Sequence, residues 1–124
     1  MAAQPDFWGE IGTAEVRTPL SILREQAALL GKKTKGLVEA MVDTDTSGRD
    51  FRHRFKLVVP ALDNYAYELF RITNGIDLYP VTAFDAGKQL TLRSEDAFLD
   101  WLKEKLSSPE TKKITANLLA LATG

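Results

Sequence analysis

The spacing of hydrophobic and polar positions changes several times along the chain, and the first regular pattern is helical. Leucines and alanines follow Thr18-Pro19 at three- and four-residue intervals, the spacing of one helix face. Thr18 can cap the first turn, where proline is tolerated because its missing N–H has no helical partner to lose. Gly31 is a typical helix end, and the lysines after it complement the C-terminal dipole. We therefore predict a helix from Pro19 to Gly31.

The spacing changes to two residues at Val38, which predicts a β-hairpin. Before Ser47-Gly48 the even-numbered positions are mainly apolar, and after it the odd-numbered positions are. A two-residue turn at Ser47-Gly48 pairs Thr46 with Arg49. One face of this hairpin is apolar, and the other carries cross-strand ion pairs. The other predicted partners are Val38 with Leu57, Ala40 with Phe55, Val42 with His53, Glu39 with Lys56, and Asp43 with Arg52.

A second helical spacing follows Pro60 and ends at Asn74-Gly75. Its apolar positions are Leu62, Tyr65, Ala66, Leu69 and Phe70. Residues 76–84 then form a short extended segment, and Pro80 within it favours an edge strand. Residues 85–87 are predicted to turn, and residues 89–93 alternate weakly as a further strand.

Two cap signals near the C-terminus predict two more helices. Ser94 precedes two acidic residues and a helical apolar stripe, and Ser108-Pro109 repeats the hydroxyl-plus-proline start. The last helix extends to about Ala122. The predicted order is α-β-β-α-β-β-α-α. We therefore expect an α+β fold, in which helices pack against an antiparallel, hairpin-based sheet.

No repeat or linker divides the chain, so residues 1–124 are predicted to form a single domain. Residues 1–6 are expected to be a loose leader. Phe7 and Trp8 come next, and large aromatic residues near a terminus usually dock on their own domain. We expect these two rings to pack against the core.

Composition and charge exclude several classes of function. Sixteen basic and seventeen acidic residues give a net charge of −1, whereas a dedicated nucleic-acid-binding domain usually has a positive excess. The absence of cysteine excludes disulfides and thiolate chemistry. No apolar run approaches the roughly 20 residues that span a bilayer, and no signal-peptide pattern is present. A cytoplasmic location, without a membrane partner, is expected.

The hairpin carries the candidate chemistry of an enzyme. Glu39 and Asp43 lie on one predicted strand face, and paired carboxylates there can hold magnesium in a metal-dependent phosphodiesterase or nuclease. His53 is the only histidine and completes this alternative site. Basic residues face the acids, however, so surface ion pairs are the simpler interpretation.

The basic residues of the hairpin suggest nucleic-acid binding as another alternative. Arg49, Arg52 and Arg54 alternate with Phe51 and Phe55, and charge combined with aromatic stacking can bind single strands. The alternation places arginines and phenylalanines on opposite faces, whereas such binding needs them on one surface. Nucleic acid is therefore an unlikely partner on this pattern.

The leading hypothesis is a non-enzymatic protein-binding module, such as an adaptor, an immunity-type inhibitor or a chaperone-like protein. Tyr67 and Arg71 lie on the outer face of the predicted second helix, and Tyr79 begins the predicted edge strand. Tyrosine and arginine dominate protein interfaces, and an edge strand can accept a partner strand. We expect a protein partner or a homodimer, with no cofactor and no metal.

Overall fold

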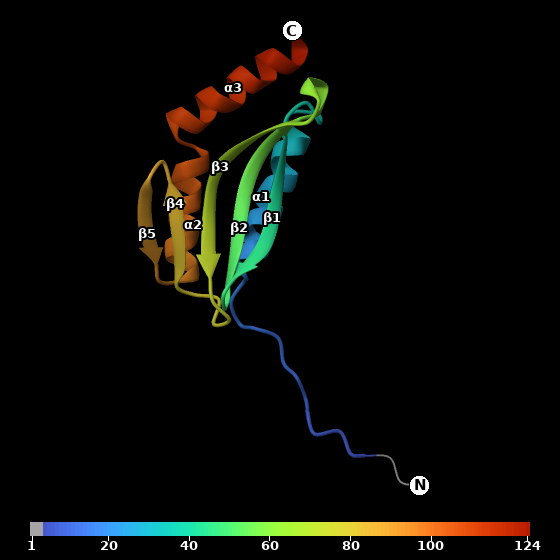
Figure 1. The fold of residues 1–124 in the computed structure, drawn as a ribbon, viewed down its shortest axis with the longest axis vertical. Coiled ribbons are helices and arrows are strands. Elements are labelled where there is room, and N and C mark those ends of the chain that lie inside the picture. The colour runs from blue at the N-terminus through green and yellow to red at the C-terminus, as the bar shows by residue number, and fades with distance from the viewer. Residues whose placement is uncertain (1–3) are drawn as a thin grey trace.

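The computed structural model describes residues 4–124 and forms an α+β fold, as predicted (Figure 1). Five strands form one antiparallel sheet in which sequence order and spatial order coincide. Three helices and one short 3₁₀ turn complete the structure. Their bounds are α1 Pro19–Lys33, β1 Glu39–Ser47, β2 Asp50–Val59, η1 Pro60–Leu62, β3 Tyr65–Asn74, β4 Val81–Asp85, β5 Lys88–Leu92, α2 Glu95–Leu106 and α3 Pro109–Thr123.

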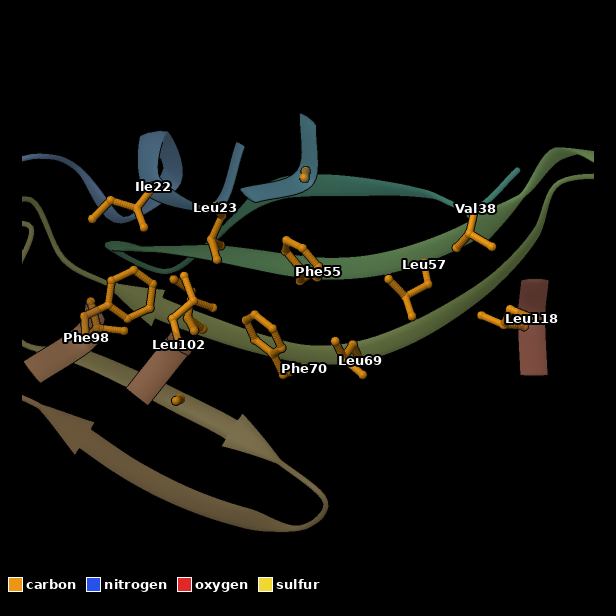
Figure 2. Packing of buried hydrophobic residues seen from close by; sticks show 14 of the residues in the cluster. Ile22, Leu23, Val38, Phe55, Leu57, Leu69, Phe70, Phe98, Leu102 and Leu118 are labelled. Carbon is orange, nitrogen blue, oxygen red and sulfur yellow. The ribbon is translucent and has the colours of Figure 1, made fainter. Parts of the chain in front are cut away.

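The helices lie on one face of the sheet and leave the other face open. Figure 1 shows α1 behind β1 and β2, α2 behind β3 and β4, and α3 crossing one end of the sheet. The buried apolar residues of the strands and helices form one core on the covered side (Figure 2). Its centre is an aromatic group: Phe55 stacks on Phe70, which meets Trp101 edge-on, and Trp101 stacks against Phe98.

The predicted hairpin is confirmed, but its register is shifted by two residues. Val42 lies opposite Phe55, and Ser47 pairs with Asp50. The turn residues are therefore Gly48 and Arg49. Gly48 has a φ of 63°, and a glycine with positive φ suits the first central position of a two-residue turn. Because a shift of two residues preserves strand faces, the apolar and charged sides remain as predicted.

The predicted helix after Pro60 is wrong, because these residues form β3. The pairing of β2 with β3 passes from Phe55 opposite Phe70 to Lys56 opposite Glu68, which leaves Leu69 as the extra residue of a bulge. Leu69 and Phe70 are both buried. Two adjacent buried residues break the two-residue alternation and imitate the stripe of a helix.

The strand predicted within residues 76–84 is present as β4, but its predicted position at the edge of the sheet is wrong. β4 begins after Pro80 and lies between β3 and β5, so β1 and β5 are the edges of the sheet. Pro80 precedes the strand, where it removes no hydrogen bond from the ladder. The predicted turn before β5 is present, and Ala86 and Gly87 both have positive φ, as in a type I′ turn.

The N-terminal segment departs most from expectation. Residues 1–3 of the predicted leader lie outside the described residues, and residues 4–16, called the arm below, extend away from the domain (Figure 1). Phe7 and Trp8 are 78% and 80% exposed, so the prediction that they dock on the core is wrong. Within residues 4–124, none of the helices is long and apolar enough to cross a lipid bilayer.

Candidate functional site

The structure places the predicted interface residues on three separate surfaces. Tyr67 lies opposite Leu57 on the helix side of the sheet. Arg71 lies on the open face, with its guanidinium 5.2 Å from the ring centre of Phe84. Tyr79 lies in the loop before β4, where its hydroxyl donates to the Arg17 carbonyl at 2.8 Å. The three side chains therefore do not form one surface.

Tyr79 anchors the base of the arm. Burial and the nearby Glu95 carboxylate raise the pKa of its phenol to about 12. The Arg17 N–H donates to the Glu95 Oε1 atom at 2.6 Å, and the Arg17 side chain pairs with Glu25. The chain is thus fixed on both sides of Arg17, immediately before α1 begins.

The residues predicted for a metal site are divided between the two faces. Asp43 lies on the open face and accepts from the Lys56 ammonium at 2.6 Å, whereas His53 points to the core. Glu39 lines a groove beside α1. Among residues 4–124, no three histidine or carboxylate side chains gather as metal ligands would.

Arg52 and Arg54 of the predicted basic cluster form ion pairs on the open face, and Arg49 lies in the hairpin turn. Arg52 binds Asp45 through two bonds of 2.9 and 2.8 Å, and Arg54 lies 3.5 Å from both Asp45 and Glu68. The Arg52 hydrogen bond lowers the pKa of Asp45. Cross-strand ion pairs were predicted, and the register shift has changed their partners. Phe55 is buried on the other face, so arginine and phenylalanine are separated as expected.

His53 belongs to a buried polar network. Its Nε2 atom lies 3.0 Å from the Asn74 Oδ1 atom, and its Nδ1 atom lies 2.9 Å from the Thr44 hydroxyl. Asn74 uses its amide nitrogen to donate to the Gly75 carbonyl, so its oxygen must accept from His53. This assigns the proton to Nε2 and makes Nδ1 the acceptor of the Thr44 hydroxyl. Burial, more than any other factor, lowers the pKa of His53, which keeps the ring neutral.

The lowered pKa of His53 predicts that stability falls on acidification. In the unfolded chain His53 takes up a proton near pH 6.5, whereas in the folded chain it does so only at a lower pH. The stability that the neutral ring contributes above pH 6.5 is therefore lost as the pH falls below that value. One proton gives a slope of at most about 1.4 kcal/mol per pH unit. Urea unfolding measured at a series of pH values below 6.5 should show this slope of the free energy of unfolding in the natural protein and a smaller slope in His53→Gln. Equal slopes would contradict the assignment.

A groove runs between α1 and the free edge of β1. Among residues 4–124, β1 pairs only with β2, so its other side carries unpaired backbone groups. Ala27, Ala28 and Gly31 face the groove from α1, and these small residues leave a cavity of about 460 Å³. Ala40 and Val42 line it from β1, and the charged residues around it are Arg24, Lys32 and Glu39.

The hairpin turn decides which backbone groups of β1 face this groove. In a hairpin closed by two residues, the flanking pair exchanges both hydrogen bonds, and bonded pairs then alternate along the strands. Ser47 and Asp50 are that pair, so the odd-numbered residues of β1 bond to β2. Ala40, Val42 and Thr44 therefore direct their N–H and C=O groups toward the free edge.

The sequence contained one sign of this groove. Ala27, Ala28 and Gly31 stand three and four residues apart, which puts small residues on one helix face. The position of β1 at the edge could not be predicted, because it depends on the order of all five strands. Comparison of the chain with protein-family models, curated proteins and solved structures found no match. Function must therefore be inferred from the geometry of the chain itself.

Proposed function

We propose that the protein is a non-enzymatic protein-binding module that accepts an extended segment of a partner protein as an added strand beside β1. The free edge of β1, bordered by the small side chains of α1, is the observation that supports this proposal most. Edge-strand recognition takes its affinity from main-chain hydrogen bonds and its specificity from pockets for alternate side chains. The groove offers both.

The main chain of β1 supplies a sequence-independent part of the binding energy. Ala40, Val42 and Thr44 each present one donor and one acceptor to the incoming strand. Each hydrogen bond contributes about 0.5–1.5 kcal/mol net, because water is displaced from both partners. A segment that spans these three residues is therefore held in register along the edge.

The side chains around the edge define the kind of segment that fits. Side chains on the covered side of the added strand enter the groove beside Ala28 and Gly31, which suits small apolar residues. Side chains on the open side lie next to Asp43 and Asp45, which suits basic or polar residues. The ligand is thus an extended segment in which small apolar and basic residues alternate.

The acidic residues along β1 disfavour a second copy at this edge. If two β1 strands paired antiparallel around Val42, Glu39 of each copy would lie opposite Asp45 of the other. Directly opposed like charges destabilise a strand pair. The partner at this edge is therefore a different protein.

Proline substitutions test the proposal because they can block one edge without opening the sheet. Ala40→Pro removes an N–H that faces the β1 edge, whereas Gln89→Pro does the same at the β5 edge. Linear peptides displayed on phage should be enriched by the natural protein and by Gln89→Pro, but lost with Ala40→Pro. Bound peptide should slow hydrogen exchange at the amides of Ala40, Val42 and Thr44.

Two results would contradict the proposal. One is peptide binding that Ala40→Pro leaves unchanged, and the other is a selection that enriches no peptide. Circular dichroism of both proline variants provides the control for folding, since each variant should retain the spectrum of the natural protein.

A further inference from the structure

A second cavity lies on the helix side of the sheet, away from the β1 groove. It consists of two adjoining spaces of about 520 and 230 Å³ between α1, α2 and the start of α3, and both touch Gln26, Lys33 and Leu106. We call them together the helix cleft. Its inner part is lined by apolar side chains from the helices and the sheet, namely Leu29, Leu30, Phe55, Leu57, Leu69 and Leu106.

The mouth of the helix cleft is basic. Lys33 from α1, Lys103 from α2 and Lys112 from α3 line it, and all three are exposed. Asp100 is the acidic residue of the same lining. A ligand for this cleft therefore combines a large apolar group with negative charge.

The arm of the same chain has this chemistry. Phe7, Trp8 and Ile11 are each more than three-quarters exposed, which is unfavourable for side chains of this size in water. Asp6 and Glu10 flank them, and Glu15 follows. The arm thus carries apolar anchors between acidic residues, and its charge is complementary to the lysines of the cleft mouth.

We propose that the arm of one copy binds the helix cleft of a second copy. Trp8 and Phe7 fill the apolar inner part, while Asp6 and Glu10 lie against Lys33, Lys103 and Lys112. When each copy inserts its arm into the cleft of the other, the exchange is reciprocal and closes as a symmetric dimer. This dimer is independent of the strand-binding groove beside β1, which stays free in each copy.

The direction of the arm favours a second copy over the chain's own cleft. The hydrogen bonds on both sides of Arg17 fix the base of the arm, and from there the arm leads away from the rest of the domain (Figure 1). The ten residues from Trp8 to Thr18 can span at most about 35 Å when extended. That reach is long enough for Trp8 to enter the cleft of a neighbouring molecule. Because it also exceeds the length of α1, about 22 Å for 15 residues, a peptide titration is needed to distinguish this cleft from the chain's own.

Sedimentation equilibrium of the full chain tests the exchange. We expect the natural protein to dimerise and the triple variant Phe7→Ser, Trp8→Ser, Ile11→Ser to be monomeric. Loss of Trp8 alone should weaken the dimer by about 30-fold, as expected for an aromatic hot spot. A natural protein that stays monomeric, or a triple variant that stays dimeric, would overturn the proposal.

Charge reversal locates the contact on the cleft. Lys33→Glu with Lys112→Glu should weaken the dimer, because both side chains line the mouth. Lys32→Glu with Lys113→Glu makes the same charge change on the same two helices but outside the cleft lining, and it should leave the dimer unchanged. Equal effects of the two pairs would show a non-specific charge effect and would contradict a contact at the mouth.

Binding of a synthetic peptide of residues 4–17, taken together with the oligomeric state, distinguishes an arm that enters its own cleft from one that enters the cleft of another copy. Titrated into the triple variant, whose own arm is disabled, it should bind, and the Lys33→Glu, Lys112→Glu changes should weaken it. Peptide binding together with a dimeric natural protein supports exchange between copies. Peptide binding together with a monomeric natural protein would show that the arm enters its own cleft, and absence of peptide binding would remove the arm–cleft contact itself.

Discussion

Replacing Phe98 with alanine is expected to lower the free energy of unfolding by about 3–5 kcal/mol. Phe98 is fully buried, and its ring stacks against Trp101 with ring centres 6.3 Å apart. Phe98 belongs to the same buried core cluster as Ile22 of α1 and the buried residues of the sheet (Figure 2). Alanine would leave a cavity in this core, because the surrounding structure relaxes only partially.

Urea unfolding followed by circular dichroism measures this effect. Ile76→Ala is the matched control, since Ile76 is 79% exposed and its loss should change stability by less than about 0.5 kcal/mol. Phe98→Leu keeps part of the volume and should lose less than Phe98→Ala. If Phe98→Ala cost no more than the Ile76 control, the placement of α2 on the core would be wrong.

The sequence predicted the elements whose pattern depends on near neighbours. The helix from Pro19 begins with a Thr18 side chain that accepts from the Ser21 N–H, and Ser94 and Ser108 cap α2 and α3 in the same way. The hairpin was recognisable because its apolar positions alternate on both strands. These signals depend on residues close together in the sequence, so contacts with distant segments do not change them.

The failures have a common physical cause, which is that distant contacts decided the outcome. The helical spacing from Leu62 to Phe70 was real, yet pairing with β2 and the bulge at Leu69 made it a strand. Tertiary pairing routinely outweighs local propensity of this kind. The error in the hairpin register is an exception with a local cause, because Gly48 occupies the first and not the second central position of the turn.

The candidate surfaces were less predictable than the fold. Tyr67 and Arg71 were expected on one helix face, but the strand and its bulge place them on opposite faces of the sheet. The groove beside β1 and the helix cleft are each formed by segments far apart in the chain. Phe7 and Trp8 were expected to dock on the core, so the sequence patterns indicated neither the exposure of the arm nor the cleft that complements it.

The ion pair between Lys105 and Asp85 joins α2 to the end of β4. It is buried enough that removing one partner should affect stability differently from replacing both. The Lys105 ammonium donates to the Asp85 Oδ1 atom at 2.9 Å, and the two side chains are only 8% and 28% exposed. Removing one partner of a buried pair leaves an uncompensated charge, whereas replacing both with apolar groups costs little. The two residues should therefore respond differently alone and together.

Asp85→Ala is expected to lower the free energy of unfolding by about 3 kcal/mol, because it leaves the Lys105 charge buried without a partner. Lys105→Met should be nearly neutral, since the chain of methionine keeps the packing and Asp85 can reach water more easily. The double variant should recover most of the stability that Asp85→Ala loses, and the double-mutant cycle from urea unfolding measures that recovery. Lys103→Met, an exposed lysine on the same helix, provides the control and should change stability by less than about 0.5 kcal/mol. If the losses from Asp85→Ala and Lys105→Met simply add, the pair does not couple α2 to the sheet.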